Sequence, residues 1–195
     1  AHTIHTYIVQ LIGFTFYPVL VGKPNTGKTQ LQKGLAKIDY NGRFSGNTTP
    51  TAAVRLAHAY QTSIHQDEAD KMSDEKKRQL MALYNTGYDK DGSYTQTNMN
   101  AESISDQIRE IRSFCPKTLS LNHYGKDWAD SFRSRGIIVR TERTDRSDIE
   151  DVVTLSKNQK KSLQRMRNAI AAYVLRNWED IIEDIQEVQR NLDSY

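Results

Sequence analysis

The stretch that most limits what this chain can fold into is Gly22 to Thr29, with the sequence GKPNTGKT. It fits the pattern of Gly, any four residues, Gly, Lys, then Ser or Thr. Glycines let the backbone curl so that successive N–H groups point into one cavity, and a following helix adds its positive end. The apolar run 17–21 predicts a buried strand before this loop, and residues 30–37 predict a helix after it. This order favours a polyphosphate site over a chance match in an ordinary turn.

The loop also predicts individual roles. Lys28 is expected to reach the β- and γ-phosphates as a point charge, and the Thr29 hydroxyl to occupy one position around a Mg²⁺ ion. The nucleotide-binding set that we expect is Gly22, Pro24, Asn25, Thr26, Gly27, Lys28, Thr29 and Gln30.

Hydrolysis would require a second, acidic site. Asp67 and Glu68 follow a possible strand at 62–66, so we expect Asp67 to hold the metal with Thr29 and Glu68 to polarise the attacking water. Taken alone, two adjacent acids are more typical of a helix-capping surface pair, and the phosphate loop is what favours the catalytic interpretation. The preceding strand is unusually polar, because His65 and Gln66 stand where a parallel sheet normally has apolar residues.

Length and composition limit the organisation. The 195 residues allow one substantial α/β core, expected at 1–150, with a helical segment at 151–195. The 27 Lys and Arg against 24 Asp and Glu are compatible with nucleic-acid contact without requiring it. A single cysteine, Cys115, excludes an internal disulfide and favours a reducing compartment. The apolar stretch 7–21 is too short and interrupted to span a bilayer, so we expect a soluble cytoplasmic protein that makes no membrane contact. Since no initiator Met is present, we expect a piece of a longer protein.

Periodicity and turn residues predict the remaining elements. Helices are expected at 1–12, from Pro50 towards Tyr60, from Ser73 through Tyr84, at 101–112, around 127–132, and in two parts from 156 onward with a break at Asn177 and Trp178. Strands are expected at 117–121, ending at Asn122, and at 136–140, whereas 41–47 and 144–151 are expected to be exposed loops. Asp91-Gly92 predicts a tight hairpin over 88–95.

The ordered blocks resemble the AAA+ ATPases, and in particular an AAA+-like family of plasmid and phage replication proteins often found beside primase modules. The blocks that carry the resemblance are residues 22–29, 45–52, 67–70, 84–88, 113–117 and 130–138. The resemblance implies an α/β fold of the P-loop NTPase (AAA+-like) type: a three-layer αβα arrangement with a central parallel sheet, plus C-terminal helices. It places the phosphate-loop strand in the middle of the sheet with the Asp67 strand beside it.

The same resemblance implies a homo-oligomeric ring, with a hexamer favoured, and ATP and Mg²⁺ as cofactors. Asn122 would sense the γ-phosphate, and Arg135 would reach the nucleotide of a neighbouring subunit, with Arg133 as the next candidate. A guanidinium suits the charge that develops on a transferring phosphoryl group. Two solvated arginines at a helix end are the equally weighted alternative.

The predicted function is Mg²⁺-dependent ATP hydrolysis that drives translocation on, or unwinding of, DNA in the replication of a mobile element. A hairpin tip at Lys90, with Tyr94 stacking on single-stranded bases, is one expected nucleic-acid contact; an ordinary solvated hairpin is the alternative, because Asp89 and Asp91 flank the lysine. Two other functions stay open: a small phosphotransferase, although no arginine-rich lid is evident, and a nucleotide-binding switch or scaffold without turnover.

Overall fold

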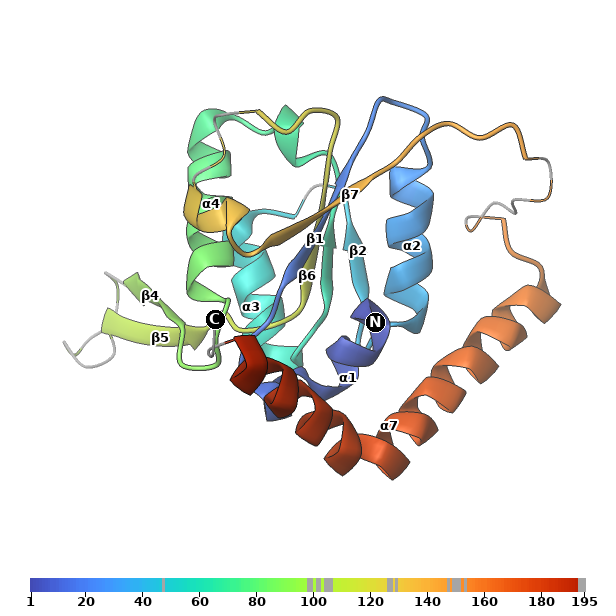
Figure 1. Ribbon diagram of the computed structural model, residues 1–195. Coiled ribbons are helices and arrows are strands. Elements are labelled where there is room, and N and C mark those ends of the chain that lie inside the picture. The colour runs from blue at the N-terminus through green and yellow to red at the C-terminus, as the bar shows by residue number, and fades with distance from the viewer. Residues whose placement is uncertain are drawn as a thin grey trace.

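Five parallel strands form the central sheet of the protein (Figure 1). The structure is a computed structural model that describes residues 1–46, 48–97, 100, 103, 107–125, 128, 130–146, 148, 152 and 154–192. The sheet strands are β1 (Tyr17–Val21), β2 (Arg43–Ser45), β3 (Ile64–Gln66), β6 (Lys117–Leu121) and β7 (Gly136–Arg140). Their order across the sheet is β2-β3-β6-β1-β7.

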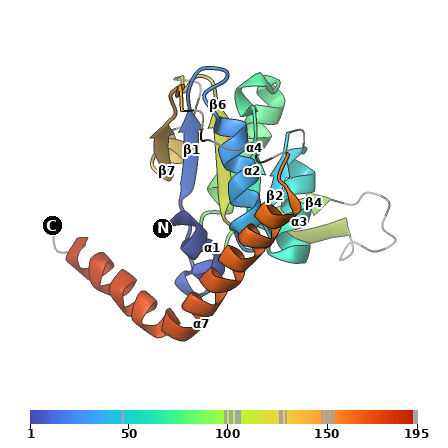
Figure 2. The same cartoon turned by 90° about the vertical axis from the view of Figure 1, so that its right-hand side faces the viewer.

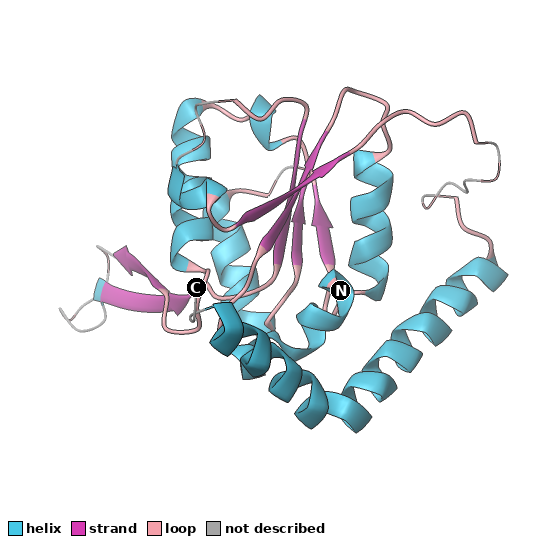
Figure 3. Ribbon diagram, in the orientation of Figure 1, coloured by secondary structure: helices cyan, strands magenta, loops and turns pink. Residues whose placement is uncertain are grey.

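Helices cover both faces of this sheet and complete a three-layer α/β fold of the P-loop NTPase type (Figure 3). Helix α2 (Lys28–Ile38) lies on one face, and α3 (Pro50–Tyr60) and α4 (Asp74–Thr86) lie on the other. The remaining helices are α1 (His2–Ile12), the 3₁₀ turn η1 (Ala69–Lys71), α6 (Asp130–Arg133) and α7 (Lys157–Leu192). Among the described residues, none of the helices has the length and apolar character needed to cross a membrane.

Several boundaries follow directly from the local sequence. Helix α1 ends at Gly13, whose φ of 83° lies in the left-handed region that glycine adopts without strain. Helix α3 begins with Pro50 in its first turn, and the Thr49 hydroxyl accepts a hydrogen bond from the Ala52 N–H. The Ser73 hydroxyl caps α4 in the same way. The strand predictions at 17–21, 117–121 and 136–140 and the break at Asn177 are confirmed.

The order of strands corrects one expectation. Strand β6 lies between β1 and β3, so the Asp67 strand is not the neighbour of the phosphate-loop strand, and β1 is the fourth of five strands. Strand β6 is buried along its whole length although Lys117, Thr118 and Ser120 are polar, because each of these side chains has a buried hydrogen-bond partner. Residues 43–45, expected to be a loop, form β2 at the outer edge of the sheet.

The hairpin prediction was wrong in position. Strand β4 (Ser93–Thr97) pairs with β5 (Ile108–Arg112) in antiparallel fashion, so the end of the hairpin falls within 98–107, most of which lies outside the described residues. Residues 108–112 are therefore a strand and not the end of a helix. The backbone N–H of Lys90 donates to the Gly13 carbonyl at 2.9 Å, and Tyr94 packs against the core. Lys90 is thus held at the root of the hairpin and Tyr94 lies close to that root, so neither forms its tip.

The root of this hairpin is fastened to the core by a buried lysine. The Lys117 ammonium donates to the carbonyls of Gly87, Ser113 and Cys115 at 3.2, 2.9 and 3.1 Å. It also lies over the rings of Tyr17 and Tyr84. Burial lowers the pKa of Lys117 from its usual value. Residues 87 and 113 flank the two hairpin strands, so one side chain at the start of β6 holds both ends of the hairpin.

Candidate functional site

The candidate site lies where three neighbouring strands of the sheet end. Gly22 directly follows β1, Asp67 follows β3, and Asn122 follows β6. Strand β6 pairs with both of the others, with Gln66 opposite Leu119 and Val21 opposite Leu121. Because the strands are parallel, their carboxyl ends meet at one edge of the sheet, where ligands of open α/β sheets bind.

The phosphate-loop backbone has the curled form that its glycines predict. Asn25 and Gly27 have φ angles of 65° and 82°, and Lys28 begins α2 directly after Gly27. A Cβ on Gly22 would lie 2.2 Å from the Thr141 hydroxyl oxygen and 2.4 Å from the Thr141 carbonyl oxygen, so only glycine fits there. The hydroxyl groups of Thr26 and Thr141 are 2.8 Å apart, which ties the loop to the segment after β7.

Lys28 extends across the inside of the loop. Its ammonium donates to the carbonyls of Gly22 and Lys23 at 2.5 and 2.9 Å and to the Asn122 Oδ1 atom at 3.2 Å. The residue is only 8% exposed. Its charge is therefore held over the loop mouth by acceptors that a phosphate oxygen can replace.

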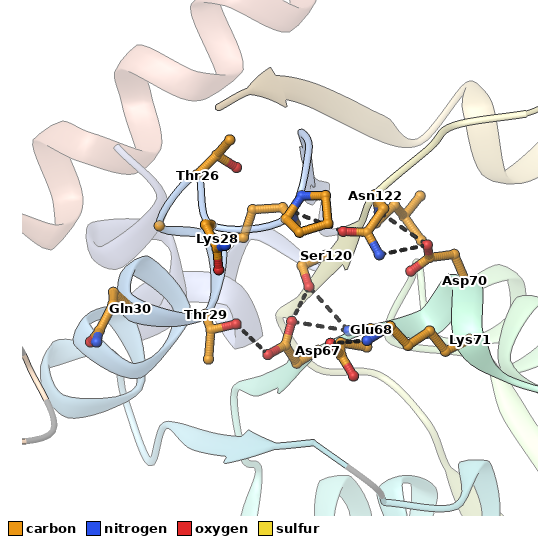
Figure 4. A pocket seen from close by; sticks show the side chains of 14 residues that line it. Thr26, Lys28, Thr29, Gln30, Asp67, Glu68, Asp70, Lys71, Ser120 and Asn122 are labelled. Atoms are coloured by element: carbon orange, nitrogen blue, oxygen red, sulfur yellow. Dashed lines mark hydrogen bonds and ion pairs between the residues drawn. The ribbon is translucent and has the colours of Figure 1, made fainter. Parts of the chain in front are cut away.

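Thr29 and Asp67 meet beside the lysine (Figure 4). The Thr29 hydroxyl donates to the Asp67 Oδ2 atom at 2.6 Å. The other carboxylate oxygen of Asp67 accepts hydrogen bonds from the Glu68 N–H, at 3.0 Å, and from the Ser120 hydroxyl. Asp67 is 6% exposed and held on both of its oxygens, so its orientation is fixed before any ligand binds.

Two oxygens at this spacing suit a Mg²⁺ ion. Neighbouring ligands of an octahedral Mg²⁺ are about 3 Å apart, since each metal–oxygen distance is about 2.1 Å. Within the described residues, no group of three or more His, Cys, Asp or Glu side chains could hold a metal. Thr29 and Asp67 are the two oxygen ligands that meet here, and Mg²⁺ commonly completes such a shell with phosphate oxygens and water.

Glu68 occupies a strained position at the rim. Its φ of 50° and ψ of 39° are unusual for a residue with a side chain. Its side chain is half-exposed and forms an ion pair with Lys71 at 2.5 Å. The hydrogen bond to Glu68 raises the pKa of Lys71 from its usual value. The Glu68 carboxylate is thus at the cavity rim and paired with a neighbouring cation.

Asn122 is oriented by a residue that sequence reasoning missed. The Asp70 Oδ2 atom accepts hydrogen bonds from the Asn122 backbone N–H, at 3.2 Å, and from its side-chain Nδ2, at 3.0 Å. This leaves the amide oxygen of Asn122 facing Lys28. Ser120 was missed as well. Asp70, three residues after Asp67, could have been found from its spacing, but nothing in the sequence links Ser120 to Asp67.

The predicted loop residues Pro24, Asn25, Thr26, Gly27, Lys28, Thr29 and Gln30 all line one cavity of about 260 Å³. Asp67, Glu68, Asp70, Lys71, Ser120, Leu121 and Asn122 complete its lining. The structure therefore brings together every predicted site residue except two. Gly22 lies behind the loop, where its carbonyl accepts from Lys28.

Arg135 is the other exception. It precedes the first residue of β7, whereas the loop follows the last residue of β1, and the register pairs Tyr17 with Gly136. Arg135 therefore lies at the opposite end of the strands. Its guanidinium donates to the Asn85 Oδ1 atom at 3.0 Å and lies over the Tyr88 ring.

The polar strand β3 is explained by buried partners. His65 lies between the Thr118 hydroxyl, 2.9 Å from its Nδ1 atom, and the Asp39 carboxylate, 3.3 Å from its Nε2 atom. The Gln32 amide donates to the Gln66 carbonyl at 2.9 Å and to the Thr118 hydroxyl at 3.3 Å. The hydrogen bonds of Thr118 and Gln32 thus give partners to part of this buried polar set, whereas the His65 Nε2 atom and the Asp39 carboxylate have no hydrogen bond within the described residues.

No family model and no curated protein matches the chain. Among solved structures, JCV helicase bound to a small molecule is 15% identical, with a TM-score of 0.48 over 97% of this chain and 54% of its own. JCV helicase in a second structure is 16% identical, with a TM-score of 0.44 over 98% and 54%. The apo C-terminal region of NrS-1 is 18% identical, with a TM-score of 0.46 over 87% and 38%.

The chain thus spans about half the length of the JCV helicase structures and less of the NrS-1 structure. These identities and TM-scores are too low to show a family. The class that the fold and the site define is a P-loop NTPase-type α/β domain.

Proposed function

We propose that the protein is a Mg²⁺-dependent ATPase. The observation that carries the proposal is the meeting of Lys28, Thr29, Asp67 and Asn122 at the ends of three adjacent parallel strands, directly beside the curled loop. This is the set of groups that binding and hydrolysing a nucleoside triphosphate requires. Residues 1–150 form the catalytic core in this proposal, and 151–195 form a helical segment attached to it.

Each residue of the candidate site has its own role in this proposal. Loop amides and the Lys28 ammonium neutralise the phosphates, and Lys28 exchanges its carbonyl acceptors for phosphate oxygens. Thr29 and Asp67 would hold a Mg²⁺ ion, which would supply positive charge to stabilise the transferring phosphoryl group. Glu68 orients the attacking water once its carboxylate leaves Lys71. Asn122, held by Asp70, detects the γ-phosphate through its contact with Lys28.

A second cavity supports a nucleotide as the ligand, as opposed to free phosphate. It has a volume of about 750 Å³ and shares Asn25, Thr26, Gly27 and Gln30 with the first. Its far side carries Leu31, Leu35 and Ile38 of α2, and residues 141–144 form another wall. A flat, weakly polar base attached to phosphates in the first cavity fits an apolar space that begins on the same loop.

The decisive experiment compares Lys28→Ala with Lys37→Ala, an exposed lysine near the end of the same helix. Loss of one charge-assisted contact to phosphate is worth about 1.5–3 kcal/mol, or roughly a 10- to 150-fold increase in the Kd for ATP. Affinity is measured by titration with a fluorescent ATP analogue, and folding by circular dichroism. Unchanged affinity in a folded Lys28→Ala protein would refute the proposal.

Glu68→Gln then separates an ATPase from a nucleotide-binding switch or scaffold. An ATPase retains ATP binding in this variant and loses turnover, because an amide is a poor base. A scaffold shows negligible phosphate release before and after the substitution. The measurement is phosphate release with excess Mg²⁺, repeated with and without single-stranded DNA, because work on nucleic acid predicts that the strand stimulates turnover.

Arg135 has a role only between subunits in this proposal, since it lies at the far end of the strands from its own loop. Mixing Arg135→Ala with Lys28→Ala subunits would then restore part of the turnover, because some interfaces in a ring contain both groups intact. No recovery at any ratio, in mixed assemblies verified by mass, would rule out action in trans.

A further inference from the structure

Helix α7 bends at Asn177, whose φ of −123° and ψ of 18° are not helical. The part before the bend packs along the molecule, since α7 contacts α1 and α2. Figure 2 shows the part after the bend leading away from the sheet and its covering helices. We call residues 178–192 the C-terminal arm.

The C-terminal arm is amphipathic. Apolar residues recur at spacings of three, one, three and three, which places them along one face of a helix: Trp178, Ile181, Ile182, Ile185 and Val188. Trp178 is 43% and Val188 58% exposed, and the three isoleucines are partly exposed. The arm carries five acids against one arginine, a net charge of −4: Glu179, Asp180, Glu183, Asp184 and Glu187, with Arg190.

An uncovered apolar surface of opposite charge lies on the sheet. Strand β7 is its outermost strand, and Ile137 and Val139, which share one face of it, are 52% and 38% exposed. Ile138, on the opposite face, is 45% exposed. Residues 133–143 carry four arginines and one acid, a net charge of +3. Exposed β-branched residues on a sheet edge are a surface that proteins normally cover.

We propose that the C-terminal arm of one copy of this chain docks onto β7 of a second copy. The stripe that begins with Trp178 would cover Ile137 and Val139, and the acids of the arm would face the arginines that flank β7. Within the described residues, α7 packs mainly against α1 and α2, and β7 pairs with β1. Opposite net charges favour this encounter and disfavour pairing of arm with arm.

The test uses one variant in each surface and a matched control. Val188→Glu alters the arm, Ile137→Glu alters β7, and Leu175→Glu alters the most exposed apolar side chain of α7, which lies before the bend. All three positions are exposed, so the folded state is expected to survive. Self-association is measured without nucleotide by sedimentation velocity over about a hundredfold range of protein concentration.

The parent and Leu175→Glu are expected to associate equally, and each of the other variants at least about tenfold more weakly. An equimolar mixture of Val188→Glu and Ile137→Glu should regain association, because one arm and one β7 remain intact in each mixed pair. A monomeric parent at every concentration, or association that survives both substitutions, would overturn the proposal.

Cross-linking provides an independent readout. Val139→Cys chains mixed with Val188→Cys chains should form a disulfide between copies under mild oxidation, while the native Cys115 is buried and does not compete. A chain that carries both Val139→Cys and Val188→Cys is tested beside this mixture. If the disulfide forms only within that chain and not between copies, the arm packs on its own β7 and the proposal is wrong. Both measurements are made without nucleotide, so they stand apart from the proposed ATPase activity.

Discussion

Lowering the pH below neutrality should destabilise the fold through two buried histidines. His65 is fully buried between Thr118 and Asp39, and His5 is buried with its Nε2 atom 2.9 Å from the Thr15 hydroxyl. Burial lowers the pKa of both imidazoles to about 4, with His2 adding to the effect and Asp39 opposing it. Below pH 6.5 the unfolded chain binds protons at these positions that the folded chain does not, so stability falls as the pH falls from 6.5 towards 4.

The magnitude follows from the same values. At pH 5 each histidine is mostly protonated in the unfolded chain and mostly neutral in the folded chain. This difference lowers the free energy of unfolding by about 2 kcal/mol for each histidine and by about 4 kcal/mol for the two together. That is a large part of the about 5–15 kcal/mol by which domains are stable. Urea unfolding at pH 7.5, 6.5, 5.5 and 5.0 measures this loss directly.

A double variant with His5→Gln and His65→Gln, although less stable at pH 7.5, should show a shallower decline with pH. His123→Gln is the control, because that histidine is exposed. If the double variant does not fold, His5→Gln alone should remove about half of the pH-dependent loss. A parent protein and variant with the same dependence between pH 7 and 5 would refute the reasoning.

Three further substitutions have predicted effects on stability, nucleotide binding or turnover. Leu119→Ala removes a fully buried side chain from β6 and should lower the unfolding free energy by about 2–5 kcal/mol in urea titrations. Gly22→Ala forces a Cβ against Thr141 and should cost about 1–3 kcal/mol, with loss of nucleotide binding in the same fluorescence titration. Asp70→Ala frees the Asn122 amide and should lower kcat about tenfold or more with little change in nucleotide affinity, and equal effects on both would contradict the positioning role.

The sheet and the phosphate loop were predictable because each depends on local sequence. The strands at 17–21 and 136–140 are short runs rich in apolar and β-branched residues, the strand at 117–121 carries Leu119 and Leu121 at alternating positions, and the loop is fixed by its glycines. Capping residues before α3 and α4 made those helices predictable too. Lys28 and Thr29 were proposed from the loop pattern, Asp67 from the acids that follow a strand, and Asn122 from the AAA+ resemblance; in the structure they lie together because the parallel strands end at one edge.

What was missed depends on partners distant in sequence. Strand β2 is three residues long and forms because Arg43 to Ser45 pair with β3, not because of their own propensity. Strand β5 was mistaken for a helix, since it is stabilised by pairing with β4 across about ten intervening residues. Ser120 and His65 owe their burial to Asp67 and Asp39, contacts that no local pattern encodes.

The attachment of the hairpin root through Lys117 has a consequence for the candidate site. Strand β6 begins at Lys117 and ends next to Asn122, so five residues, about 17 Å of extended chain, connect this attachment to the candidate nucleotide site. Lys117 donates to main-chain carbonyls, and Gly87 leaves room for it, because a Cβ at position 87 would lie 2.4 Å from the Lys117 Nζ atom. Any side chain at position 87 would therefore disturb the attachment of the hairpin to the strand that ends at the candidate site.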